Sequence, residues 1–488
     1  MTVHIHLIAC CGTGMGSLAG MLKARGYHVT GSDQHIYPPM STQLQAWGIP
    51  IAEGFRDEHL QPRPDLVVVG NAVSRTNPEV IAAQRAGIPA LSLPQALAHF
   101  FIQQRHAVVV TGTHGKSTTT ALIAWLLYHA GYAPSFFVGA VMQNMQSTFH
   151  LGHGAHFVVE GDEYDSAYFD KAPKFLHYRP RTAVLTSVEF DHADIYRDLR
   201  HVRAAFVRFL HLLPSDGCLV ACTDQPSVRE LLAETRLPAP MQTYGLQAPA
   251  DWCAVDCSPS AQGMQATVLH RGTRVARFTS PLMGRHNVQN LLAAVAVTQH
   301  LGLSAAQIAA GLATFQHIKR RCEIRGEVDG VTVIDDFAHH PTAVRATVEA
   351  VRESYPGRRV WAVFEPRTAT SRRAIFQHEY ADALRVADCV VLADVHRKEQ
   401  LPVGERFSPE QLTQALQAQG VAAWYYPTTQ AIIEHLCRDA QRPDIILMMS
   451  NGGFDNIHQR LLTALTQRSL AVRATAVACP SDSGGSLR

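Results

Sequence analysis

Charge of either sign is scarce in this chain of 488 residues. Charged residues make up 17% of it, and 43 Lys and Arg against 41 Asp and Glu leave a formal net charge of +2. Such a balance does not favour nucleic acid or an anionic membrane as a partner, since both attract an excess of positive charge. No apolar run reaches the roughly 18 residues of a membrane-spanning helix, and the first residues lack the basic segment of a signal peptide. We therefore expect a cytoplasmic protein with neither nucleic-acid nor membrane partners.

Cysteine is present in an ordinary number, with 10 in the chain. Cys218 and Cys222, like Cys253 and Cys257, have three residues between them, whereas zinc knuckles and redox motifs have two. We expect scattered reduced thiols, as in most cytosolic proteins. Apolar residues make up 47% of the chain, which is enough for a large core and argues against disorder.

The beginning of the chain has the pattern of a nucleotide-binding α/β unit. "VHIHLIACC" predicts a buried strand, "GTGMGS" a glycine turn and "LAGMLKARG" a helix, and the next strand ends at Asp33. A further strand, "DLVVVGNAV", ends near Asn71. Ser17 stands where a third glycine is expected, so a purely structural turn remains an alternative. The pattern predicts a Rossmann-like domain over residues 1–105.

The stretch "VVVTGTHGKSTTT", residues 108–120, resembles a phosphate-binding loop but is shortened. The standard loop has four residues between its first glycine and the Gly-Lys pair, whereas only two separate Gly112 from Gly115. A valine-rich strand precedes it and a helix follows, so backbone N–H groups and the helix dipole can hold a polyphosphate. The predicted contacts are Gly112, Thr113, His114, Gly115, Lys116, Ser117 and Thr118. The loop alone leaves ATP hydrolysis, phosphorylation and ligation open.

Acidic side chains follow the next two strands. "EGDEYD", residues 160–165, follows "HFVV", and "EFDHAD", residues 189–194, follows "TAVL". Carboxylates and an imidazole that converge at one sheet edge indicate metal sites around the phosphates. A solvated acidic loop is the alternative for residues 160–165.

The remaining chain predicts the end of a central ATP-binding domain, residues 106–316, and a third α/β domain, residues 317–468. Asn287 and Asn290 share a helix face and could read a purine edge. "VTVIDDFAHHPTAV" predicts a strand that ends in Asp335 and Asp336, and later strands alternate with helices. The small, polar residues 469–488 predict a disordered tail. The fold class is therefore α/β, with three consecutive domains.

Taken together, the motifs "GTHGK", "EGDEYD", "DHAD", "GRHNVQN", "RRCE" and "DDFAHHP" resemble the Mur ligases, the ATP-dependent amide-forming enzymes of peptidoglycan synthesis. "FEPRTATSRR" is similar to the member that joins the tripeptide L-Ala-γ-D-Glu-meso-diaminopimelate to UDP-N-acetylmuramate during peptidoglycan recycling. The sibling that adds L-alanine typically has Pro-His-Arg there and is the alternative function. A non-catalytic UDP-sugar-binding regulator is a further alternative.

The resemblance implies ATP as co-substrate, two Mg²⁺ ions, and small-molecule substrates bound by a monomer or homodimer. It implies that Lys116 stabilises the transferring phosphoryl group, that Ser117, Glu160 and His192 hold Mg²⁺, and that Glu160 and His192 thereby serve catalysis. The other implied contacts are Asn287 and Asn290 to adenine, Arg321 to phosphate, Asp336 to the ATP ribose, Gly12, Thr13, Gly14, Met15, Gly16, Asp33 and Asn71 to the UDP-sugar, and His339, Arg367 and Arg372 to the peptide.

The chain departs from the family pattern in three places. Ser187 stands where Asn is usual, Cys322 where Phe is common, and Phe337 where Tyr is frequent. Ser187 in place of Asn makes an expected side-chain contact near the phosphate loop uncertain. Phe337 in place of Tyr removes a hydroxyl group.

Overall fold

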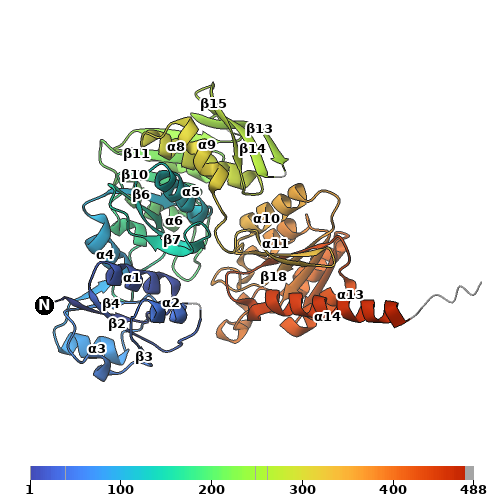
Figure 1. Cartoon of the computed structure of the whole chain (residues 1–488), viewed down its shortest axis with the longest axis horizontal. Coiled ribbons are helices and arrows are strands. Elements are labelled where there is room, and N and C mark those ends of the chain that lie inside the picture. The colour runs from blue at the N-terminus through green and yellow to red at the C-terminus, as the bar shows by residue number, and fades with distance from the viewer. Residues whose placement is uncertain (1, 39, 248, 261, 479–488) are drawn as a thin grey trace, which may run out of the picture. The chain divides into compact units, whose positions relative to one another are not determined.

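The computed structural model describes residues 2–38, 40–247, 249–260 and 262–478. The chain divides into two compact units, one of residues 1–282 and 286–319 and the other of residues 283–285 and 320–488. Figure 1 shows the elements of each unit.

The first sheet of the first unit is parallel and has the strand order β3-β2-β1-β4-β5. Apolar residues alternate between its faces, so that α1 and α4 pack on one face and α3 on the other. The strands are β1 (His4–Ile8), β2 (His28–Asp33), β3 (Ile51–Glu53), β4 (Leu66–Val69) and β5 (Ala90–Ser92), and the helices are α1 (Thr13–Ala24), α2 (Met40–Ala46), α3 (Pro78–Arg85) and α4 (Leu93–Leu97).

The second sheet has ten strands in the order β15-β14-β13-β12-β11-β10-β6-β9-β7-β8. The strand before the phosphate loop, β6, lies between β9 and β10 and is parallel to both. The strands are β6 (His106–Thr111), β7 (Ser135–Met142), β8 (Ser147–His150), β9 (His156–Gly161), β10 (Thr182–Leu185), β11 (Cys218–Cys222), β12 (Met241–Gly245), β13 (Trp252–Ser260), β14 (Gly263–His270) and β15 (Thr273–Ser280). The helices are α5 (Lys116–His129), α6 (Leu199–Leu210), α7 (Pro226–Glu234), α8 (Arg285–His300) and α9 (Ala305–Thr314).

A shared apolar core joins these two sheets, which explains why they form one compact unit. Helix α1 packs on the β7–β8 hairpin, where Ser17 Oγ lies 2.6 Å from Thr148 Oγ1. A Cβ on Gly20 would come within 2.9 Å of the Phe149 ring. Ser17 therefore has a packing role at the position where the sequence pattern expected a third glycine.

The second unit contains one six-stranded sheet with the order β16-β17-β21-β18-β19-β20, of which only β16 is antiparallel to its neighbour. Helices α10, α11 and α12 cover one face, and α13 and α14 cover the other (Figure 1). The strands are β16 (Glu323–Val328), β17 (Val331–Asp336), β18 (Val360–Phe364), β19 (Cys389–Ala393), β20 (Ala422–Tyr426) and β21 (Ile445–Met449). The helices are α10 (Pro341–Ser354), α11 (Gln377–Leu384), α12 (Pro409–Ala418), α13 (Thr429–Asp439) and α14 (Ile457–Ala478).

The predicted disordered tail overlaps helix α14 at residues 469–478, and the disorder stays a prediction. Helix α14 continues through them, because residues such as Leu470 and Ala471 have good helix propensity and no Pro or Gly interrupts the run. Residues 479–488 of the predicted tail lie outside the described residues.

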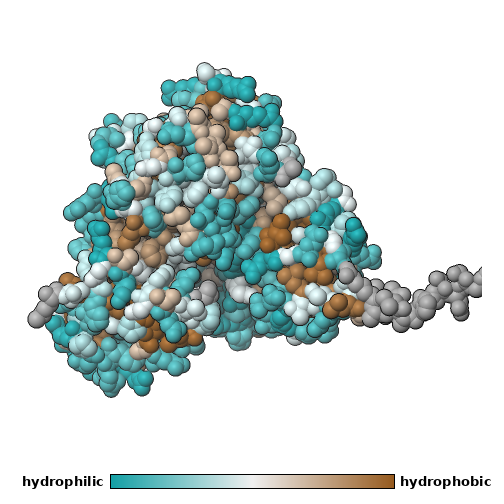
Figure 2. Space-filling model, in the orientation of Figure 1, coloured by the Kyte–Doolittle hydropathy of each residue, from teal (hydrophilic) through white to brown (hydrophobic). Residues whose placement is uncertain are grey.

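The α/β class with a Rossmann-like first domain, a phosphate-loop central domain and a Rossmann-like third domain is confirmed, while the boundaries at residues 105, 316 and 468 stay predictions. Within the described part of the chain, every helix is too short or too polar to cross a membrane, and the described cysteines are unbridged. The face drawn in Figure 2 is mostly hydrophilic with scattered hydrophobic patches.

Candidate active site

The shortened phosphate loop is tightly enclosed by its neighbours. Gly112 and Gly115 have φ of +131° and +78°, conformations that side-chain-bearing residues rarely adopt. A Cβ on Gly112 would overlap Thr186 Oγ1 just beyond β10, and one on Gly115 would overlap Asn290 Oδ1 on α8. Both glycines are therefore required by conformation and by space.

Ser187 ties this loop to the segment that follows β10. The backbone N–H of His114 donates to Ser187 Oγ at 2.9 Å, and that of Thr113 donates to the Ser187 carbonyl at 3.0 Å. The Glu189 N–H donates to Thr113 Oγ1 at 2.8 Å. Where the family pattern has Asn, Ser187 thus still provides a side-chain acceptor for the loop.

Lys116 begins helix α5 and points back over the loop. Its Nζ donates to the Gly112 carbonyl at 2.6 Å and lies 2.8 Å from Glu163 Oε2. Burial alone would lower the pKa of Lys116, but Glu163 and then Asp162 outweigh it and raise the pKa. The ammonium is therefore held in its charged form beside the loop.

Glu160 and Ser117 form a second polar group beside Lys116. Ser117 Oγ donates to Glu160 Oε2 at 2.9 Å, and the Gly139 N–H donates to Oε1 at 2.5 Å. Burial, followed by repulsion from Asp162, raises the pKa of Glu160. A nearby cation would offset both effects.

His192, in the segment after β10, has a φ of +53°, and its ring lies beside the acidic loop. Its Nε2 lies 3.6 Å from Glu163 Oε1. Although burial would lower the pKa of His192, the bond and charge of Glu163 raise it. The structure thus brings His192 and Lys116 to the two oxygens of one carboxylate.

These residues fit Mg²⁺ by charge and by donor type. Three carboxylates, those of Glu160, Asp162 and Glu163, face the two ammonium groups of Lys116 and Lys174. The excess negative charge suits a divalent cation, and a hydroxyl with carboxylate oxygens forms a hard-ligand set. Ser117 and Glu160, which are 2.9 Å apart, would hold the ion, and it would supply charge neutralisation for the phosphates. His192 lies against Glu163, and its role as a third ligand stays a prediction.

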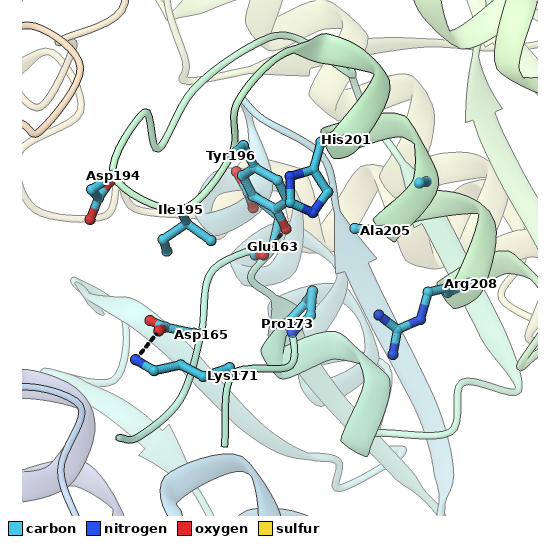
Figure 3. A pocket seen from close by; sticks show the side chains of 11 residues that line it. Glu163, Asp165, Lys171, Pro173, Asp194, Ile195, Tyr196, His201, Ala205 and Arg208 are labelled. Carbon is cyan, nitrogen blue, oxygen red and sulfur yellow. Dashed lines mark hydrogen bonds and ion pairs between the residues drawn. The ribbon is translucent and has the colours of Figure 1, made fainter. Parts of the chain in front are cut away.

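A cavity of about 540 Å³ opens beside this cluster (Figure 3). The residues that line it include Glu163, Asp165, Tyr196, His201 and Arg208. The Tyr196 hydroxyl donates to the Glu163 carbonyl and fixes that segment. The cavity gives the acidic loop a solvent-accessible wall.

The predicted adenine pair lies together on α8. Asn290 Nδ2 donates to Asn287 Oδ1 at 2.9 Å, and Thr119 Oγ1 on α5 donates to Asn290 Oδ1 at 3.2 Å. Both amides are buried next to the phosphate-loop helix. Their adenine contact stays a prediction.

The predicted UDP-sugar residues lie at the carboxyl edge of the first sheet. Gly12 caps α1, and Asn71 is exposed just after β4. Asp33 accepts the Cys11 N–H at 2.7 Å and the His35 N–H at 3.1 Å, so it shapes the glycine turn. A Cβ on Gly16 would overlap the Met40 side chain.

In the second unit, Asp336 is enclosed by its own backbone. Its Oδ2 accepts the Cys322 N–H and its Oδ1 accepts the Ala338 N–H, both at 2.7 Å. The Arg321 guanidinium lies over the Phe337 ring at 5.0 Å. Phe337, which stands where Tyr is frequent, thus packs under an arginine, and the predicted ribose and phosphate contacts stay untested.

The predicted peptide-binding residues follow β17 and β18, two strands of the same sheet that are separated by β21. Arg367 NH1 lies 3.3 Å from Glu365 Oε1, and a Cβ on Gly452 would overlap the Arg367 side chain. Arg372 NH1 donates to the His396 carbonyl at 3.3 Å. His339 Nδ1 lies 3.0 Å from the Phe337 carbonyl. The loops after β17, β18 and β21 meet at one edge, as carboxyl ends of parallel strands do.

Three family models match consecutive parts of the chain. They are the Mur ligase family catalytic domain over residues 4–105, the Mur ligase middle domain over residues 110–298, and the Mur ligase glutamate ligase domain over residues 320–452. The chain belongs to the Mur ligase family. Its fold and phosphate-loop site are accordingly those of an ATP-dependent ligase.

Relatives of two kinds match this Mur ligase over nearly its full length. The UDP-N-acetylmuramate–L-alanyl-γ-D-glutamyl-meso-2,6-diaminoheptandioate ligase of Escherichia coli is 39% identical, covering 96% of this chain and 100% of the relative. The UDP-N-acetylmuramate–L-alanine ligase of Acetivibrio thermocellus is 32% identical, covering 94% and 95%. The crystal structure of a murein peptide ligase from Psychrobacter arcticus is 38% identical, covers 95% and 99%, and has a TM-score of 0.71.

Two functional candidates were missing from the predicted site of this Mur ligase. Ser187 was noted only as a departure, and Glu163 only as one member of an acidic loop. The spacing of "EGDEYD" identified the loop but not which carboxylate faces Lys116, since that depends on how the chain turns after β9.

Proposed function

We propose that this Mur ligase joins the tripeptide L-Ala-γ-D-Glu-meso-diaminopimelate to UDP-N-acetylmuramate at the expense of ATP, in the cytoplasm, during peptidoglycan recycling. The observation that carries the proposal is the full-length match, at 39% identity, to the Escherichia coli enzyme of that name. The matches to L-alanine ligases are weaker, for example 32% and 35% identity to those of Acetivibrio thermocellus and Pelotomaculum thermopropionicum.

The first chemical step activates the lactyl carboxylate of UDP-N-acetylmuramate. One carboxylate oxygen attacks the γ-phosphorus of ATP, the bond to the β-phosphate oxygen breaks, and ADP leaves with an acyl phosphate formed. Lys116 and the loop N–H groups of residues 112–117 stabilise the charge that develops on the phosphoryl oxygens. Mg²⁺, held by Ser117, Glu160 and His192, would neutralise further phosphate charge.

The peptide amine then attacks the acyl carbon. The tetrahedral intermediate collapses to an amide and releases inorganic phosphate, and the amine loses one proton to solvent. The acyl phosphate must be kept from water, because hydrolysis would return the starting carboxylate.

Arg367 and Arg372 are proposed to bind carboxylates of the peptide, since guanidinium groups pair bidentately with carboxylates. Glu365 holds Arg367 at 3.3 Å, and Ser371 Oγ accepts the Arg367 N–H at 3.0 Å, so the arginine is placed by its own loop. We expect Arg367→Ala to raise the tripeptide KM about tenfold. The matched control is Arg373→Ala, whose guanidinium lies 3.6 Å from Glu405. An unchanged tripeptide KM with activity retained would exclude Arg367 from peptide binding.

The proposed function is tested by ADP release from ATP, Mg²⁺ and UDP-N-acetylmuramate with a panel of amines. Tripeptide should accelerate release strongly and L-alanine weakly. Faster release with L-alanine would assign the alternative function, and binding of the UDP-sugar without ADP release with any amine would indicate a regulator. A monomer or homodimer stays the predicted state.

A further inference from the structure

Glu163 takes no part in the two chemical steps, although it contacts Lys116 and His192, which are both assigned to the phosphoryl transfer. One carboxylate oxygen lies 2.8 Å from Lys116 Nζ, and the other lies 3.6 Å from His192 Nε2. The side chain is 3% exposed. Its backbone carbonyl accepts the Tyr196 hydroxyl, so the residue is fixed at both ends.

Glu163 is one of several partners of the Lys116 ammonium. The ammonium also donates to the Gly112 carbonyl at 2.6 Å and lies 3.5 Å from the Thr113 carbonyl. The buried Glu163 carboxylate forms an ion pair with this same ammonium, at 2.8 Å. A buried negative charge next to a phosphate-binding lysine repels the phosphates and competes with them for the ammonium.

We propose that Glu163 is a positioning residue, which fixes the Lys116 ammonium relative to the His192 imidazole for phosphoryl transfer and in doing so weakens the binding of ATP. The proposal deepens the proposed function and rests on the role of Lys116 in it. Interactions that favour the transition state over bound ATP raise kcat, whereas equal strengthening of both does not. Because Glu163 and the ATP phosphates compete for the Lys116 ammonium, Glu163 limits the affinity for ATP before phosphoryl transfer.

Two effects of opposite sign follow for Glu163→Gln, which keeps the size and one acceptor oxygen but removes the charge. The Kd of ATP should fall about three- to tenfold, the scale of one charged hydrogen bond. The kcat should fall about 10- to 100-fold, as when outer partners of active-site groups are removed. A merely structural role would weaken ATP binding and lower the melting temperature together.

The experiment measures ATP binding by calorimetry with Mg²⁺ and without the other substrates, then kcat, KM and the melting temperature. Glu163→Asp keeps the charge and should recover part of the lost kcat with wild-type ATP affinity. Glu230→Gln is the matched control, because Glu230 lies on α7 of the same sheet domain, pairs with Arg203 at 3.2 Å and is exposed. Its ATP affinity and kcat should stay within about twofold of the wild type, as for a surface ion pair.

Tighter ATP binding with a lower kcat in Glu163→Gln, and partial recovery in Glu163→Asp, would support the proposal. ATP affinity that is unchanged or weaker, or a kcat within about twofold of the wild type, would overturn it. The binding measurement needs no amine substrate, so it remains decisive if the tripeptide assignment fails. That failure would appear separately, as absence of tripeptide-dependent ADP release by the wild type.

Discussion

The phosphate loop and the loops of the third domain use charged residues in different ways. Around the phosphate loop, Lys116, Glu163 and His192 contact one another through side chains, at 2.8 Å and 3.6 Å. At the sheet edge of the second unit, Asp336 accepts two backbone N–H groups at 2.7 Å. Side-chain pairs can exchange partners with an incoming ligand, whereas a carboxylate bound to backbone N–H groups maintains a loop conformation.

Charged residues that contact other side chains should therefore be tested by enzyme activity. Those that accept backbone N–H groups should be tested by the free energy of unfolding. A matching motif does not separate the two, since Lys116 and Asp336 both fit the family pattern. The hydrogen-bond partners do separate them. The predictions below probe that distinction.

The largest effect is expected for Lys116→Met. Loss of the ammonium removes the charge that faces the phosphates, and we expect kcat to fall about 10²- to 10³-fold, as for loss of one preorganised donor. Steady-state ADP release with a melting curve measures this. Lys171→Met is the control, since the exposed Lys171 pairs only with Asp165 among described residues, at 2.5 Å. Equal losses in both variants would contradict the special role of Lys116.

Gly115→Ala should have the next largest effect. The residue has a φ of +78°, and its new Cβ would overlap Asn290 Oδ1, so the loop or α8 must shift. We expect a cost of about 1–3 kcal/mol in unfolding free energy together with weaker ATP binding. Gly131→Ala, with a φ of +83° but open space around its Cβ, separates backbone strain from the clash. Equal ATP affinity in the two variants would show that the enclosure of the loop is unimportant.

Asp336→Asn should reduce stability rather than nucleotide affinity. In the wild type, each carboxylate oxygen of Asp336 accepts one backbone N–H at 2.7 Å. An asparagine side chain has only one acceptor oxygen, so its NH₂ group would face the other backbone N–H, and two donors would oppose each other. We expect a loss of about 1–3 kcal/mol, the cost of a buried unsatisfied donor. Asp382→Asn is the control, since Asp382 is exposed and lies 3.6 Å from Arg385. An unchanged stability with a raised ATP KM would instead assign Asp336 to the ribose.

The smallest effect concerns the opposite edge of the central sheet, where His106 lies at the start of β6. Burial, then His156, Arg181 and His300, lower the pKa of His106 from 6.5 to about 4. The folded state therefore binds fewer protons than the unfolded state between these values, and stability should fall as the pH falls from 6.5 towards 4.

Urea unfolding at pH 7.5, 6.0 and 5.0 measures this change in stability. His106→Gln should reduce the pH dependence of the unfolding free energy. The glutamine keeps a hydrogen-bond partner for Thr182 Oγ1, which lies 2.8 Å from His106 Nε2 in the wild type. A pH dependence as steep as that of the wild type would contradict the role of His106.

Much of the fold could be predicted from the sequence, because buried parallel strands and glycine turns leave strong local signals. The "VVVTGTHGKS" pattern correctly predicted β6, the loop and α5. The β13–β15 meander was missed, since its strands are half exposed and mixed in polarity. The extent of α14 to Ala478 was not predicted, because the small and polar composition of residues 469–488 was given more weight than the helix propensity of residues 469–478.

The candidate site could be predicted only in part. The predicted site residues Lys116, Glu160 and His192 lie in one cluster of the first unit, and their roles stay predictions. The motif did not indicate which carboxylate pairs with Lys116. Ser17 and Asp33 show the same limit, since packing against Thr148 and backbone bonds to Cys11 arise from tertiary structure.

The most direct test of the central claim, that ATP activates a carboxylate for amide formation, is isotope transfer. UDP-N-acetylmuramate with both lactyl carboxylate oxygens labelled with ¹⁸O is incubated with ATP, Mg²⁺ and the tripeptide, and the released phosphate is analysed by mass spectrometry. The account predicts one ¹⁸O in each phosphate, in step with formation of the amide product. Unlabelled phosphate accompanying the amide would contradict it.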